Sequence, residues 1–130
     1  IDQDYQRRRR HKWIAATKVR YVWCREMFRS GRPHYHFMFI LNQEAFNTVG
    51  NIASGRENLA ARISRAWHSA LGLTWDRNKP LIHLPKNSQY WISRNDRAGL
   101  HEAFRRLSYL CKSATKRYGD GMRSFGASRS

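Results

Sequence analysis

Residues 34–41 place the strongest constraint on the fold, because their pattern is typical of an extended strand whose two faces differ. In a strand, His34 and His36 project to one face, whereas Tyr35 and Phe37 project to the other, into a core. Two positions along a strand span roughly 6.6 Å, a separation from which two imidazole nitrogens can converge on one metal ion. The segment therefore predicts a strand that carries two candidate metal ligands.

A second strand is predicted over residues 19–28, which are rich in aromatic and apolar side chains. The connection through residues 29–33 contains glycine and proline and is turn-like, so the two segments predict an antiparallel hairpin. Glu26, the only acid between Asp4 and Glu44, can then lie across from the histidines, and it is the predicted third ligand. A solvated glutamate that points away from the histidines is the alternative.

A helix with a candidate nucleophile is predicted over residues 97–112. Four apolar residues recur there at intervals of four, three and four: Leu100, Phe104, Leu107 and Cys111. Tyr109 lies off this stripe, and it shares its own stripe with three cations: Arg105, Lys112 and Lys116. Neighbouring cations favour a phenolate and can hold a phosphate, as a tyrosine that attacks a phosphodiester requires. The alternative is a tyrosine at the edge of the core beside solvated cations.

The two motifs together resemble a known class of enzymes. The His-Tyr-His strand resembles the metal-binding signature of the HUH endonucleases, which nick single-stranded DNA with a tyrosine, and Tyr109 to Lys112 resembles the Y-x-x-K motif of rolling-circle replication initiators. From about Val19 to Arg129 the chain resembles the inovirus-type replication proteins, also described as the YagK/YfjJ C-terminal family of prophages and mobile elements. The resemblance rests on seven stretches: 22–26, 33–36, 41–42, 66–67, 81–85, 108–112 and 123–129. One departure is the single Y-x-x-K tyrosine, where two-tyrosine initiators carry a second one nearby.

The resemblance implies an α+β domain with a central antiparallel sheet and helices packed mainly on one face, a plan related to RRM and ferredoxin-like folds. It implies metal-dependent, site-specific nicking of single-stranded DNA and strand transfer through a 5′-phosphotyrosine, which starts rolling-circle replication of a phage, prophage or mobile element. Tyr109 would attack, Lys112 would steady the phosphate, and the metal ion would be Mg²⁺ or Mn²⁺. Zn²⁺ and Ni²⁺ also suit the three predicted ligands, which are His34, His36 and Glu26.

The expected partner is single-stranded DNA at an origin, including a hairpin form, with host replication proteins as further partners. The chain has 25 Lys and Arg against 9 Asp and Glu, a formal charge of +16, so it attracts polyanions. Its mean hydropathy of −0.79 and the lack of a long apolar run, signal peptide or lipidation signal argue against a membrane protein. DNA contacts are expected from four cations: Arg32, Arg105, Lys116 and Arg123.

The length of 130 residues predicts one domain, preceded by a basic arm over residues 1–17 and excised from a longer protein. We expect a monomer in the cytoplasm of a bacterial host, with both cysteines reduced. Further elements are predicted as a helix over residues 57–71, short strands over 81–84 and 89–93, and a helical turn near residues 43–46.

Two other functional classes remain open. A non-catalytic nucleic-acid-binding module would use the basic surface and keep the histidines as packing or structural zinc residues. A metal nuclease that activates water would cut DNA without a covalent intermediate. Replacement of Tyr109 with phenylalanine separates these classes, because only the tyrosine mechanism requires the hydroxyl.

Overall fold

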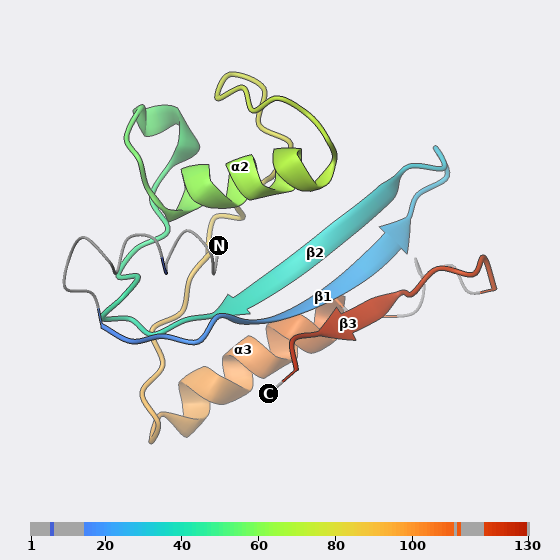
Figure 1. The fold of residues 1–130 in the computed structure, drawn as a ribbon. Coiled ribbons are helices and arrows are strands. Elements are labelled where there is room, and N and C mark those ends of the chain that lie inside the picture. The colour runs from blue at the N-terminus through green and yellow to red at the C-terminus, as the bar shows by residue number, and fades with distance from the viewer. Residues whose placement is uncertain (1–5, 7–14, 111, 113–118, 130) are drawn as a thin grey trace. The chain divides into compact units, whose positions relative to one another are not determined.

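The computed structural model describes Gln6, residues 15–110, Lys112 and residues 119–129. The chain forms two compact units. We call Val19–Ile40 with Trp91–Ser130 the sheet unit, and Ile1–Lys18 with Leu41–Tyr90 the helical unit. Together they contain a three-stranded antiparallel sheet and helices, so the predicted α+β class is confirmed (Figure 1). The basic block of the predicted N-terminal arm, residues 7–12, lies outside the described residues.

The hairpin of the sheet unit consists of β1 (Arg20–Met27) and β2 (Pro33–Ile40), which pair in antiparallel fashion as predicted (Figure 1). The connecting turn is closed by a hydrogen bond of 2.9 Å from the Gly31 N–H to the Phe28 carbonyl oxygen. Gly31 has a φ of 74°, a left-handed conformation that costs glycine little. The pairing register places Glu26 directly opposite His34.

A third strand, β3 (Phe125–Ala127), pairs with the other edge of β1 and gives the order β2-β1-β3 (Figure 1). This strand was not among the elements predicted from the sequence. Gly126 lies opposite Trp23, and a Cβ added to Gly126 would meet the indole ring. Only glycine, which has no side chain, therefore fits beside the Trp23 indole at this position of β3.

The two faces of the sheet differ in chemistry, as the alternation predicts. One face carries Glu26, His34 and His36 beside Cys24, which is 1% exposed. The other face carries an aromatic ladder in which neighbouring rings are in contact: Tyr21, Trp23, Tyr35, Phe37 and Phe39. Tyr35 and Phe37 thus point away from the histidines, but the prediction that both lie in a core is wrong, because Phe37 is 41% exposed.

The helical unit contains a short 3-10 helix, η1 (Ile52–Ser54), and α2 (Leu59–Ala70), which falls within the predicted range 57–71. Asn58 caps α2, since its Oδ1 accepts a hydrogen bond of 2.9 Å from the Ala61 N–H. The helix ends before Gly72, which has a φ of 70°. A turn closed by bonds to the Asn42 carbonyl oxygen confirms the predicted turn near residues 43–46.

The helix predicted over residues 97–112 is α3 (Arg97–Leu110) of the sheet unit. The Asp96 carboxylate begins it by accepting a hydrogen bond of 2.8 Å from the Gly99 N–H. The predicted apolar stripe is not the buried one, because Leu100 is 59% and Phe104 66% exposed, whereas Ala103 is buried. Cys111 lies outside the described residues.

The strands predicted over residues 81–84 and 89–93 are wrong, because both segments are irregular. Leu81 is 50% exposed, and the first segment lies between Pro80 and Pro85, which lack the backbone donor that a ladder needs. In the described part of the chain, the helices are too short and too polar to cross a bilayer.

Candidate functional site

A carboxylate and an imidazole meet across the hairpin on the polar face of the sheet. Glu26 of β1 and His36 of β2 approach to 3.0 Å between Oε2 and Nε2. The Glu26 side chain is 15% exposed and that of His36 is 34% exposed, so the pair is partly shielded but open to solvent. A carboxylate oxygen and an imidazole nitrogen that lie this close to each other could both bind one divalent ion.

His34 lies directly opposite Glu26 in the register, on the same face as His36. Its ring packs edge-on against Phe28, with ring centroids 4.4 Å apart and an interplanar angle of 70°. Two of the three predicted ligands therefore converge and the third is turned toward Phe28. Over the described ranges, no three histidine, cysteine or acidic side chains are grouped closely enough to hold a metal ion.

Tyr109 lies in the last turn of α3 and is 65% exposed, so its hydroxyl is open to a large substrate. Lys112 lies beside it as predicted, with Nζ 4.7 Å from the centre of the phenol ring. The ammonium group therefore faces the ring in a cation–π contact. Arg105, one helical turn before Tyr109, is exposed, whereas Lys116 lies outside the described residues.

The remaining predicted DNA contacts, Arg32 and Arg123, lie toward the same end of the sheet, where β1 turns into β2 and the chain enters β3. Arg32 is exposed in the connection between β1 and β2. Arg123 is exposed shortly before β3, and its carbonyl oxygen accepts a hydrogen bond of 3.2 Å from Arg25 Nε. Both cations are thus accessible to a polyanion.

An ion pair between the buried Arg25 of β1 and the partly exposed Asp120 was not predicted from the sequence. Arg25 is 4% exposed, and its Nη2 donates to both carboxylate oxygens of Asp120, at 3.0 and 2.9 Å. A hydrogen bond from the Met122 N–H, together with the Arg25 guanidinium, lowers the pKa of Asp120 below its usual 3.8. The pair ties the segment before β3 to β1. Asp120 is the only acid after Glu102, which is the one signal in the sequence that could have marked it as a partner for a buried cation.

Comparison with known proteins gives a family and two relatives. The family model described as the YagK/YfjJ C-terminal domain matches residues 1–128. The protein named Uncharacterized protein YfjJ, from Escherichia coli (strain K12), is 36% identical over 116 residues, which are 87% of this chain and 56% of that protein. Uncharacterized protein YagK of the same strain is 33% identical over 124 residues, 93% of this chain and 59% of that protein. The chain thus spans little more than half the length of these relatives, and no solved structure matches it.

Proposed function

We propose that this chain, which belongs to the YagK/YfjJ C-terminal domain family, nicks single-stranded DNA at a specific site and transfers the strand through a covalent tyrosine intermediate. The observation that carries the proposal is the approach of Glu26 to His36, at 3.0 Å, with His34 opposite Glu26 in the same register. A carboxylate and imidazoles on neighbouring strands are ligands that a divalent ion in a phosphodiester reaction can use, and this supports the proposal.

The donor chemistry fits a divalent cation, because one carboxylate and imidazole nitrogens suit Mn²⁺ and related ions. Glu26 and His36 would hold the ion, and His34 would join them after rotation of its exposed ring away from Phe28. When bound, the ion would polarise the scissile phosphate and stabilise the charge that develops on it. Mg²⁺ and Mn²⁺ are the ions we propose for the reaction.

Tyr109 is the proposed nucleophile that attacks the scissile phosphate. Its hydroxyl loses a proton, and the oxygen attacks the phosphorus in line, so that a bond to the 5′-phosphate forms as the bond to the 3′-oxygen breaks. The 3′-oxygen takes up a proton and leaves as a free hydroxyl, and attack by a 3′-hydroxyl reverses the step and completes strand transfer. Lys112, whose Nζ lies 4.7 Å from the centre of the phenol ring, would offer a positive charge to the phenolate and the phosphate.

The DNA backbone would be held by cations around this step. Arg105 lies one helical turn before Tyr109, and Arg32 and Arg123 are exposed elsewhere in the sheet unit. The net charge of +16 supports a polyanionic partner, since each neutralised phosphate releases a counterion. We propose single-stranded DNA as that partner because the candidate nucleophile and the metal ligands act on a phosphodiester.

The proposal is tested by cleavage of end-labelled single-stranded DNA with Mn²⁺. We expect His36→Ala and Glu26→Gln to reduce cleavage by about 100-fold or more, the loss typical of groups that stabilise transition-state charge. His83→Ala is the matched control, because His83 is exposed in the helical unit, and it should cleave like the parent chain. Full activity of His36→Ala would contradict the proposed metal site.

Tyr109→Phe distinguishes the alternative mechanisms, with Tyr90→Phe as the matched control. Loss of cleavage with Tyr109→Phe alone supports the covalent mechanism. If Tyr109→Phe retains metal-dependent cleavage, the chain is instead a nuclease that activates water. If the parent chain binds DNA but cleaves none, the chain is a non-catalytic binding module.

A further inference from the structure

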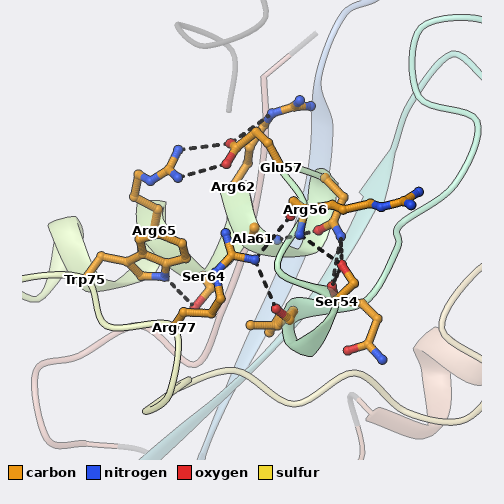
Figure 2. Close-up of polar contacts among 12 residues, drawn as sticks. Ser54, Arg56, Glu57, Ala61, Arg62, Ser64, Arg65, Trp75 and Arg77 are labelled. Atoms are coloured by element: carbon orange, nitrogen blue, oxygen red, sulfur yellow. Dashed lines mark hydrogen bonds and ion pairs between the residues drawn. The ribbon is translucent and has the colours of Figure 1, made fainter.

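Three arginines of the helical unit gather around one tryptophan and one carboxylate (Figure 2). The group comes from three parts of the unit: the residue before the cap of α2, α2 itself and the loop that follows. We call it the arginine cluster, and its members are Glu57, Arg62, Arg65, Trp75 and Arg77.

Arg65 is the centre of the cluster. Its Nη1 and Nη2 donate two parallel hydrogen bonds of 3.0 Å to the two carboxylate oxygens of Glu57 (Figure 2). Arg62 approaches the same carboxylate, with Nε 3.6 Å from Oε1. The hydrogen bonds from Arg65, helped by the charges of Arg62 and Arg77, lower the pKa of Glu57. Glu57 therefore stays ionised and occupies a guanidinium fork that matches carboxylate and phosphate equally well.

The tryptophan fixes two of the guanidinium groups. Arg65 and Arg77 stack over the Trp75 ring, with Cζ 4.5 and 5.2 Å from its centroid. The ring is itself held by a hydrogen bond of 3.2 Å from Trp75 Nε1 to Ser64 Oγ. Arg77 Nη1 also donates to two backbone carbonyl oxygens at 3.3 Å. Side chains that are ordered in this way lose little conformational entropy when they bind a ligand.

The cluster is accessible and has an excess of positive charge. The side chains of Arg65 and Glu57 are 42% and 47% exposed, and the cluster contains three arginines and one carboxylate. The whole chain carries 25 basic against 9 acidic residues, so an anionic ligand is favoured at long range as well. A diester phosphate carries the same single charge as Glu57 and presents two oxygens to the same fork.

We propose that the arginine cluster binds a backbone phosphate of single-stranded DNA, and that Glu57 competes with this phosphate for Arg65. The cluster would be a DNA contact in addition to those of the sheet unit. The inference rests on the proposed function only for its choice of DNA as the polyanion. If the cluster instead serves only to join α2 to its flanking loops, the charge on Glu57 affects DNA affinity only through the net charge of the chain, by less than about twofold.

The test measures DNA binding in a Tyr109→Phe background, so that the result does not depend on cleavage. The probe is a fluorescein-labelled single-stranded oligonucleotide, titrated by fluorescence anisotropy at several NaCl concentrations. Release of about 0.7 counterions per phosphate contact corresponds to roughly fourfold in affinity near 0.15 M salt. Arg65→Ala should therefore weaken binding roughly fourfold and reduce the log–log salt slope by about 0.7.

Glu57→Gln should do the opposite and tighten binding about two- to fourfold, because it removes the competing charge. Lys79→Ala is the matched control, since it removes an exposed cation of the same unit outside the cluster, and its affinity should change less than about twofold. Unchanged affinity in Glu57→Gln, or equal losses in Arg65→Ala and Lys79→Ala, would overturn the proposal.

Arg65→Lys keeps the test decisive if Arg65→Ala fails to fold. It preserves the charge but cannot form the two parallel bonds. We expect the affinity of Arg65→Lys for DNA to fall about twofold with an unchanged salt slope, whereas parental affinity in this variant would overturn the proposal.

Discussion

Replacement of Gly126 with alanine tests the packing that joins β3 to the sheet. The added Cβ would lie 2.5 Å from Cε2 and 2.7 Å from Cζ2 of Trp23, and nearer still to Nε1. Carbon atoms normally pack about 3.5–4.0 Å apart, so the indole or β3 would have to move by about 1 Å. Overpacking of this kind costs about 1–3 kcal/mol. Alanine also stabilises the protein by about 0.4–1 kcal/mol because it restricts the unfolded chain. We therefore expect the free energy of unfolding to fall by about 1–2 kcal/mol.

A double-mutant cycle with Trp23→Phe isolates the contact between these two residues. Phenylalanine lacks the Nε1 and Cζ2 atoms, so Gly126→Ala should cost less than about 0.5 kcal/mol in that background. Urea unfolding followed by far-ultraviolet circular dichroism gives the free energy of unfolding for all four chains. An equal cost of Gly126→Ala in both backgrounds would refute the steric argument.

Two further predictions concern a helix cap and an ion pair. Asn58→Ala should destabilise the chain by about 1–2 kcal/mol, because it removes the hydrogen bond from the Ala61 N–H. Asn58→Asp keeps the oxygen that caps α2 and should destabilise the chain less. The midpoints of urea unfolding compare the two variants. Asp120→Asn should lower the urea midpoint at neutral pH, because the pKa of Asp120 is lowered and its stabilising charge is present above the usual 3.8. The difference from the parent should shrink as the pH falls through the lowered pKa, and a difference that is independent of pH would contradict the role of the Arg25 pair.

The hairpin could be predicted because its signals are local. The alternation of residues 34–41 and the turn at Gly31 fix which side chains share a face, and this parity brings Glu26 to the same side as His36. The orientation of the His34 ring could not be predicted, because it depends on Phe28, which lies beyond the end of β1.

Elements that depend on distant partners were missed or misplaced. β3 has three residues, one of them Gly126, and its pairing joins parts of the chain about 100 residues apart, so neither propensity nor pattern indicates it. Leu81–Leu84 has the composition of a strand but no partner strand in the described part of the chain. Propensity thus predicted a strand where pairing, the stronger effect, does not occur.

The ion pairs also depend on residues that are distant in the sequence or lie in loops, so they could not be predicted. Arg25 and Asp120 are 95 residues apart, and only the burial of the arginine reveals that it needs a partner. In the arginine cluster, Trp75 is the residue that the sequence could not connect to α2, because the loop after the helix determines where the indole stacks.

The central claim is that Tyr109 becomes covalently attached to DNA, and peptide mapping tests it most directly. The chain is incubated with Mn²⁺ and a pool of single-stranded DNA, digested with nuclease and trypsin, and examined by mass spectrometry for a nucleotide-modified peptide. We expect a 5′-phosphonucleotide on Tyr109 that is absent after treatment with EDTA and in Tyr109→Phe. Cleavage of the pool with no modified peptide, or modification of a different residue, would contradict the account.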